Sequence, residues 1–339
     1  MSAATQFYVS GVLILLLINI IAVWGLDLQY GISGIYNFAF VVFQAAGAYT
    51  AALVALHPAA YYQAAETYVG GLNLPFPVPL LAATAAGGLL AIPIGYIGIR
   101  RLRGDYQAMS MLVLSLIATG FVGAQTGLLN GVIGVAFVPA PLADQLNLDR
   151  VTYQWFYALL CGIATLAAFF VMRGIVTSPF GRLLRAIRDS DTAAAALGRN
   201  PLRERMVAFI IGGSLGGLSG GLLVQYVSAW GPGSWLYPET FLLFTAIVVG
   251  GTGNLLGNTI GVLLVPILIL EGTRFLPNIG YPGLTASLDW VVVGLLLLAF
   301  IWLRPRGIIP ERRRVRVARS PLIGASEPAS APGADSEPR

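Results

Sequence analysis

Residues 7–26 read FYVSGVLILLLINIIAVWGL, an apolar run of 20 residues without a charged side chain. As an α-helix, a run of this length rises about 30 Å, which is the thickness of the hydrocarbon core of a bilayer. The chain begins MSAATQF and lacks the positively charged region of a signal peptide. We therefore expect the run to be a retained first membrane helix.

The composition extends this expectation to the whole chain. Of its 339 residues, 57% are hydrophobic and only 10% are charged, against about 25% charged in an ordinary soluble domain. All 20 basic residues are Arg, so the chain has neither a P-loop lysine nor a Schiff-base lysine. A single cysteine, Cys161, and a single histidine, His57, exclude a disulfide framework and argue against a Cys/His metal site. We expect a polytopic membrane protein without a metal or cofactor of its own.

Hydropathy divides the chain into apolar segments of membrane-spanning length. The predicted full spans lie near 7–26, 36–56, 77–99, 107–127, 154–172, 207–228, 256–271 and 286–303. A further segment, ETFLLFTAIVVGG (239–251), would rise only about 20 Å as a helix and is followed by TGN, which predicts a short broken or tilted helix. The predicted fold class is therefore all-α, a polytopic transmembrane helix bundle of about eight or nine spans.

The distribution of Arg predicts the orientation. Arg residues cluster in the loops 100–103 and 173–205 and again in 304–319, whereas the intervening loops hold almost none. Because cytoplasmic loops carry the excess of basic residues, these loops are expected in the cytoplasm. The N-terminus then lies outside and the C-terminus inside, provided that 239–251 completes a crossing.

The same distribution predicts the domain organisation. Residues 1–310 form a transmembrane domain that includes the cytoplasmic loop 173–205, and residues 311–339 form a tail. The tail is first basic and then, from Ser320, rich in Ser, Pro, Ala and Gly without apolar periodicity. Such a composition predicts disorder.

Ionisable side chains are missing from the centres of the predicted spans. The acidic residues nearest to them fall at or near span ends, namely Asp27, Asp105, Glu239, Glu271 and Asp289. Carriers driven by protons or sodium keep an ionisable group at membrane depth. This absence favours a transporter whose energy comes from another subunit, and an ion-coupled carrier is the alternative from another class. No paired carboxylates or His cluster point to a membrane-embedded enzyme.

Glycines form a ridge in the span 207–228. Gly212, Gly216 and Gly220 recur at a spacing of four and therefore share one helix face. Missing side chains on that face let a second helix approach closely. The ridge predicts tight helix packing within the fold, and a sliding surface used in gating is the alternative.

Two interrupted segments combine glycine with amide side chains. QYGISGIYNFAFVVFQAAGAY (29–49) contains Asn37 and Gln44, and VVGGTGNLLGN (248–258) contains Asn254. Broken helices in both halves of a transporter mark substrate sites, because they offer free backbone groups and dipole ends. We expect these three amides to line a translocation path. The alternative is that Gly and Asn only permit turns near the membrane interface.

The stretch GRLLRAIRDSDTAAAALG (181–198) is too polar for the bilayer. It predicts one cytoplasmic helix that ends at Gly198. Asp189 and Asp191 interrupt its positive charge, and the alanines of 193–196 remove bulk over a full turn. Both features favour docking against a protein surface over lying on anionic lipid.

This stretch and the helix after it carry a resemblance. GRLLRAIRDSDTAAAALGRNPLRERMVAFIIGGSLGGLSGGLL (181–223) resembles the cytoplasmic loop and following helix of bacterial ABC-transporter permeases of the branched-chain amino acid family. In such permeases this loop couples to the ATPase through an acidic residue, two alanines and a later glycine. Ala193, Ala194 and Gly198 match, whereas Thr192 occupies the acidic place and Asp191 lies one residue earlier. The resemblance implies an ATPase-coupling set of Arg185, Asp191, Ala193, Ala194 and Gly198.

Other stretches agree with the same family. They are FQAAGAY (43–49), IVVGGTGNLLGNTIG (247–261) and LRPRGII (303–309). LRGDYQAMSMLVLSLI (102–117) resembles the larger of the family's two permease types, whereas GIYNFAF (34–40) is closer to the smaller type.

The resemblance implies a function and a set of partners. The chain would be a permease subunit of an ABC importer for branched-chain or related amino acids, multi-pass in the bacterial inner membrane and not itself an enzyme. Its expected partners are a second permease subunit, two ATPase subunits that hydrolyse ATP, a periplasmic solute-binding protein and the lipid bilayer, with no nucleic acid. Within the same class, urea, short amides or another small polar solute are the alternative cargo.

Overall fold

The computed structural model describes residues 2–62, 68–102, 104–269, 272 and 284–311. Within these ranges the ordered elements are helices, joined by turns and two isolated β-bridges. The predicted all-α polytopic bundle is confirmed. The predicted tail from residue 312 onward lies outside the described residues.

The long helices follow the predicted apolar runs closely. Their bounds are Ala3–Asp27 for α1, Val78–Arg101 for α3, Asp105–Ala124 for α4, Arg150–Thr177 for α7 and Pro201–Val227 for α10. A π-helical turn, η1 (Leu28–Ile32), extends α1 without a break, so Ala3–Ile32 forms one apolar helix of 30 residues. Together with the four others it is long and apolar enough to cross a membrane.

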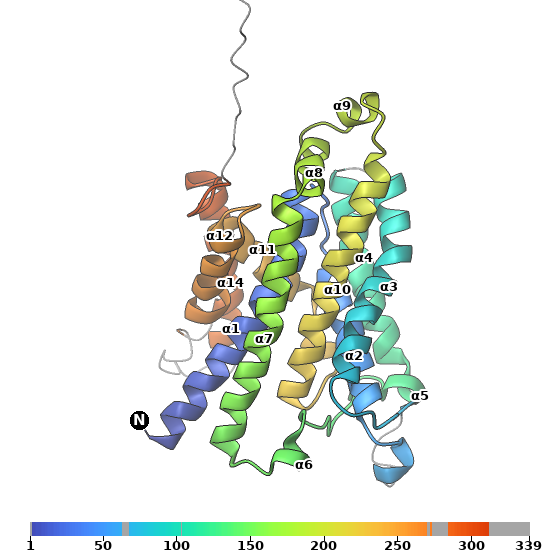
Figure 1. Ribbon diagram of the computed structural model, residues 1–339, viewed down its shortest axis with the longest axis vertical. Helices are drawn as coiled ribbons and strands as arrows, with labels where there is room; N and C mark the ends of the chain where they lie inside the picture. The colour runs from blue at the N-terminus through green and yellow to red at the C-terminus, as the bar shows by residue number, and fades with distance from the viewer. Residues whose placement is uncertain (1, 63–67, 103, 270–271, 273–283, 312–339) are drawn as a thin grey trace, which may run out of the picture.

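α10 lies at the centre of the bundle, between α1, α2 (Phe40–Ala55) and α3 (Figure 1). Glycine permits this position because the neighbouring backbones occupy the space of a side chain. A Cβ atom on Gly220 would lie 1.9 Å from the carbonyl oxygen of Gln44 in α2, and one on Gly217 would lie 2.2 Å from that of Ala83 in α3. The structure thus places α10 in direct backbone contact with helices on two sides.

The C-terminal helices form a second group beside α1. Their bounds are Tyr237–Gly250 for α11, Leu255–Val262 for α12, Leu263–Ile269 for the π-helical η4 and Leu284–Leu303 for α14. α11 and α12 form a tight antiparallel hairpin, in which a Cβ atom on Gly261 would lie 1.9 Å from the carbonyl oxygen of Ala246. α11 contains 14 residues and ends in the glycine turn, as predicted for the short broken helix.

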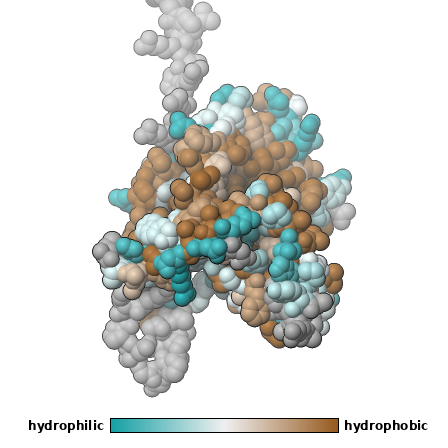
Figure 2. Space-filling model, turned by 60° about the horizontal axis from the view of Figure 1, so that its bottom comes forward, coloured by the Kyte–Doolittle hydropathy of each residue, from teal (hydrophilic) through white to brown (hydrophobic). Residues whose placement is uncertain are grey.

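The short elements lie at the two ends of the bundle. At one end are α5 (Thr126–Leu129), α6 (Ala143–Leu146) and the 3-10 turns η2 (Ala59–Tyr62) and η3 (Pro232–Ser234). Figure 2 brings this end forward and shows hydrophilic residues gathered across it, with hydrophobic surface behind them. α8 (Pro179–Asp189) and α9 (Asp191–Ala196) project beyond the opposite end (Figure 1), which we call the α8–α9 end. The N-terminus lies away from the α8–α9 end.

Two predicted boundaries are wrong. The stretch 181–198 is not one helix, because Ser190 adopts an extended conformation that ends α8 and begins α9. Its hydroxyl accepts a hydrogen bond from the Ala193 N–H at 3.3 Å, so it caps the new helix. The second span begins at Phe40 rather than at residue 36, because residues 33–39 form an irregular connection after η1.

Candidate functional site

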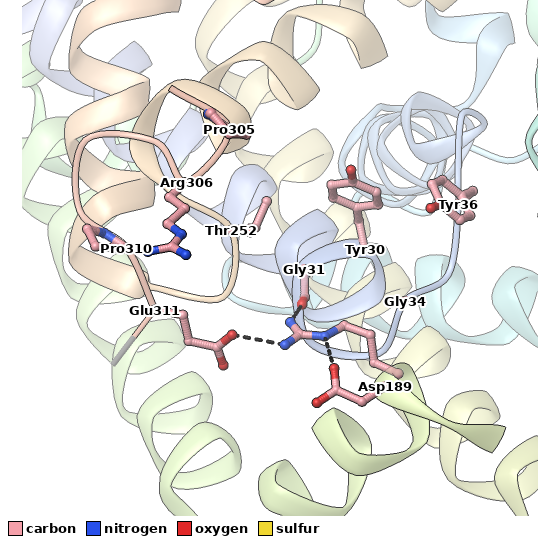
Figure 3. A pocket seen from close by; sticks show the side chains of 11 residues that line it. Tyr30, Gly31, Gly34, Tyr36, Asp189, Thr252, Pro305, Arg306, Pro310 and Glu311 are labelled. Carbon is pink, nitrogen blue, oxygen red and sulfur yellow. Dashed lines mark hydrogen bonds and ion pairs between the residues drawn. The ribbon is translucent and has the colours of Figure 1, made fainter. Parts of the chain in front are cut away.

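The α8–α9 end brings together segments that are far apart in the sequence. α8, η1, the α11–α12 turn and the C-terminal segment 304–311 surround a cavity of about 640 Å³ (Figure 3). The cavity is lined by Tyr30, Gly31, Gly34, Tyr36, Arg188, Asp189, Thr252, Pro305, Arg306, Pro310 and Glu311. Its walls therefore carry both guanidinium and carboxylate groups.

Arg188 of α8 is the most connected side chain of this cavity. Its guanidinium donates a hydrogen bond to the carbonyl oxygen of Gly31 in η1 and another to Glu311 Oε2, with an Nη2–Oε2 distance of 2.9 Å (Figure 3). A longer contact of 3.6 Å joins its Nε to Asp189 Oδ1. Arg185, one helical turn earlier, contacts Glu311 Oε1 at 2.5 Å. α8 is thus held by one carboxylate and one main-chain carbonyl.

A second arginine joins α9 and α10 to the segment after η1. Arg205 of α10 donates to Asp191 Oδ2 at 2.7 Å and, through Nε, to the carbonyl oxygen of Ser33 at 3.2 Å. η1 and the residue after it are therefore contacted by arginines from two helices. These pairs are partly buried, with side-chain exposures of 19% for Arg205 and 42% for Asp191.

The C-terminal segment completes the end of α11. The N–H groups of Ile308 and Ile309 donate to the carbonyl oxygens of Val249 and Gly250 at 2.9 and 3.0 Å. These carbonyls belong to the last turn of α11, which lacks partners within its own helix. The stretches 247–261 and 303–309, both singled out in the sequence, therefore lie in direct contact.

Asp27 ties α1 to the same turn. The sequence placed it at a span end, but the structure places it fully buried within the continuous helix Ala3–Ile32. Its Oδ1 accepts a hydrogen bond of 2.9 Å from the Gly253 N–H of the α11–α12 turn. Gly31 must lack a side chain here, since its Cβ atom would lie 2.0 Å from Asp27 Oδ1.

The amides predicted for a translocation path do not meet in one place. Asn37 is fully buried and donates to Gln29 Oε1 at 2.6 Å, and Gln29 in turn donates to the carbonyl oxygen of Phe209 in α10 at 2.9 Å. Gln44 donates to Ser219 Oγ of α10 at 3.1 Å. Asn254 caps α12 at the α8–α9 end. None of the three predicted amides lines the cavity of Figure 3, and their role on a path stays a prediction.

The glycine ridge faces α1 and α2. A Cβ atom on Gly212 would lie 2.6 Å from the carbonyl oxygen of Gly25, whereas one on Gly216 would lie 3.1 Å from the Cβ of Phe43. Gly220 makes the tightest contact of the three, against Gln44. The ridge therefore packs closely over its whole length, and most tightly at Gly220.

The residues predicted to couple to an ATPase are divided between two settings. Arg185 and Asp191 are engaged in the ion pairs described above. Ala193 is exposed, Ala194 is buried, and Gly198 ends the segment with a left-handed φ of +78°. α9 thus presents small side chains to the surroundings.

Leu197 adds a large apolar side chain to this tip. It follows α9 directly and is 84% exposed. A groove of about 420 Å³ runs beside α9, between Thr192, Ala195 and the segment that leads from α3 to α4. The end of α9 therefore combines an exposed apolar side chain with a neighbouring groove.

Sequence reasoning missed Arg188, Arg205, Gln29 and Glu311. Glu311 carried a usable signal, because it is the one acidic residue in the basic stretch 304–319. Arg188 and Arg205 carried no such sequence signal, because the residues around them do not distinguish them from the other arginines of the loop. Among the described residues, no group of three or more His, Cys, Asp or Glu side chains could hold a metal ion.

The five helices long and apolar enough to cross a membrane, together with their close glycine packing, define a polytopic membrane protein. Comparison with known proteins gives the family. The chain belongs to the family of branched-chain amino acid transport system permease components, whose model matches residues 8–301. No solved structure matches the chain significantly.

Several curated proteins are similar to this chain. The high-affinity branched-chain amino acid transport system permease protein LivM of Escherichia coli (strain K12) is 28% identical over 323 residues, which cover 88% of this chain and 69% of LivM. The corresponding permease protein BraD of Pseudomonas aeruginosa is 26% identical over 303 residues, covering 86% of this chain and 92% of BraD. The guanosine ABC transporter permease protein NupQ of Bacillus subtilis is 27% identical over 180 residues, covering 50% of this chain and 55% of NupQ. The predicted family and the larger, LivM-like permease type are confirmed.

Proposed function

We propose that this permease subunit carries branched-chain or related amino acids and that α9 is the part that docks on an ATPase subunit. The family assignment makes the chain a permease of the ABC importer class. The similarity to LivM extends over 88% of the chain, against 50% for the guanosine permease. This difference in coverage favours amino acids as the solute.

One observation carries the docking proposal. α9 projects beyond the bundle (Figure 1). Its surface consists of small exposed alanine side chains next to one large exposed apolar side chain, Leu197. A helix of this kind fits a groove on a partner protein. The ion pairs of Arg185, Arg205 and their carboxylate partners hold its base.

The proposed assembly has separate parts for energy and for passage. Two ATPase subunits hydrolyse ATP, a periplasmic binding protein supplies solute affinity, and this chain forms the membrane path with a second permease subunit. This chain would need no cofactor. The family relationship supports the assembly.

We further propose that the α8–α9 end is cytoplasmic and the N-terminus is outside. The Arg-rich loop 173–205 contains α8 and α9, which supports this orientation. In a background with Cys161→Ala, Ser190→Cys should react with an impermeant thiol reagent only from the cytoplasmic side, and Asn147→Cys only from outside. The reverse pattern would overturn the orientation.

Transport by the reconstituted complex tests the proposed function. The complex is reconstituted in proteoliposomes with the permease pair and the ATPases, and the binding protein is added on the side opposite α9. These vesicles should accumulate leucine only when ATP is present on the side that α9 faces. An ionophore should leave this uptake unchanged. Uptake that survives ATP depletion and collapses with the ionophore would instead identify an ion-coupled carrier.

A second candidate solute is urea, a short amide or another small polar molecule. The similarity to a protein named as a guanosine permease shows that related chains are associated with other cargo. Competition in the same vesicles separates the candidates. Excess unlabelled leucine should abolish uptake of labelled leucine, and excess urea should not.

A further inference from the structure

Glu311 occupies a junction between the α8–α9 end and the transmembrane helices. Its two carboxylate oxygens contact two different arginines of α8, Arg185 Nε at 2.5 Å and Arg188 Nη2 at 2.9 Å. Its side chain is only 17% exposed. The carboxylate therefore pairs with guanidinium groups on two consecutive turns of one helix, by an ion pair with Arg185 and a charge-assisted hydrogen bond from Arg188, and both contacts are partly shielded from water.

Glu311 is itself fixed to the α11–α12 hairpin. Two residues before it, Ile309 is hydrogen-bonded to the carbonyl oxygen of Gly250. A Cβ atom on Gly253 would lie 3.2 Å from Glu311 Cδ, so the carboxylate rests against the hairpin turn. Glu311 therefore connects α8 to this turn.

Arg188 makes the corresponding connection to η1. Besides Glu311, its guanidinium bonds the carbonyl oxygen of Gly31 (Figure 3). Gly34, with a φ of +71°, leaves room for its stem, because a Cβ atom there would lie 2.9 Å from Arg188 Cγ. The same guanidinium thus contacts the first interrupted segment and, through Glu311, the second.

We propose that Arg188 and Glu311 form a latch that transmits the movement of the docked α8–α9 pair to both interrupted segments. This inference rests on the proposed function, since it requires an ATPase that moves α9. Rotation of the side chains can break and re-form such an ion pair during a cycle, whereas the glycine contacts of α10 cannot open without separating helices. Glu311 is accordingly a positioning residue for coupling and not a contact of the solute.

The ratio of solute taken up to ATP hydrolysed tests the latch. Glu311→Gln keeps the shape of the side chain and removes its charge. In the reconstituted complex we expect ATP hydrolysis to stay within about twofold of the parent and uptake per ATP to fall at least about fivefold, the lower range of coupling between sites. Glu311→Asp, which restores the charge, should recover part of the ratio.

Glu204→Gln is the matched control. Glu204 lies in the first turn of α10 at the same end of the molecule, and no ion pair joins it to the described arginines. It should keep the parental ratio. Should Glu311→Gln keep that ratio as well, the latch is wrong.

Two further outcomes are distinguishable. If Glu311→Gln no longer forms the complex, Arg188→Gln, which removes the other member of the latch, gives the independent measurement. We expect a lowered ratio there too, and a parental ratio would contradict the latch. If neither variant forms the complex, the pair has a structural role and the latch is overturned. If the complex with the unsubstituted chain shows no ATP-dependent uptake, the proposed function is refuted instead.

Discussion

α10 and α8 both join segments that are distant in the sequence, but they do so with opposite chemistry. α10 makes contact through absent side chains, so that a Cβ atom on Gly220 would lie 1.9 Å from the Gln44 carbonyl oxygen. α8 makes contact through long charged side chains, with Arg188 Nη2 lying 2.9 Å from Glu311 Oε2. The first kind of contact excludes any added atom. The second kind of contact depends on the charge and the length of the side chains.

This difference predicts how each region responds to change. Close-packed helices cannot relax around an added group, so substitutions in the centre act on folding. The ion pairs at the α8–α9 end remain in contact with water and can lose a partner without enclosing a charge in the core, so we expect substitutions there to act mainly on function.

Gly220→Ala should strongly destabilise the fold. The added methyl group has no space against α2, and we expect a loss of more than about 3 kcal/mol in the free energy of unfolding. The measurement is the yield and thermal unfolding of monodisperse protein extracted in detergent. Gly120→Ala in α4 is the control, because nothing lies within 4 Å of the position of its Cβ. Equal thermal stability of the two variants would contradict the account of the centre.

Asp191→Arg should strongly lower uptake while the chain remains in the membrane. The substitution places a second guanidinium beside Arg205, which now contacts Asp191 Oδ2 at 2.7 Å. Like charges at an interface cost several kcal/mol, so uptake should fall by about tenfold or more. Membrane content is measured by immunoblot and uptake in the same vesicles. Asp191→Asn removes the ion pair without adding a positive charge, so its uptake should fall less. Parental uptake by Asp191→Arg would refute a role for Asp191 in transport.

Asn37→Ala should destabilise the fold moderately. It removes the buried partner of Gln29 Oε1, and an unsatisfied buried polar group costs about 1–3 kcal/mol. Thermal unfolding measures this loss. Uptake is then compared with the parent at a temperature where both are folded. A parental rate there would make Asn37 a structural residue, and a lowered rate with unchanged affinity of the binding protein would place it on the path.

Asn254→Ala should have the smallest effect. Asn254 Oδ1 accepts hydrogen bonds from the N–H groups of Leu256 and Gly257 at 3.1 and 3.4 Å, and loss of an N-cap costs about 1 kcal/mol. Asn254→Ser should retain most of the stability, since serine also caps helices. If both variants unfold at the same lowered temperature, the amide acts through something other than capping.

The sequence predicted what depends on local pattern. Apolar run length located the membrane helices, and the glycine run located the break between α11 and α12, because both follow from neighbouring residues. The meeting of 247–261 with 303–309 could not be predicted in this way. It depends on backbone hydrogen bonds such as that of Ile308 with Val249, which no periodicity encodes.

The division of 181–198 shows the same limit at shorter range. Arg and Ala favour helix throughout this stretch, yet Ser190 adopts an extended conformation because its hydroxyl caps α9. Arg188 and Arg205 then reach η1 and the residue after it from the two sides of this break. Their partners are carbonyl oxygens of a distant segment, so their importance could not be recognised from the loop alone.

Site-specific photocrosslinking tests whether α9 receives the ATPase subunit. A photoreactive residue is introduced at the exposed Ala195 of α9 in the assembled complex, and a second one at Leu128 of α5, which is 45% exposed at the opposite end. We expect a crosslink to the ATPase subunit from Ala195 and none from Leu128. A crosslink from Leu128, or none from Ala195 in a complex that hydrolyses ATP, would contradict this expectation.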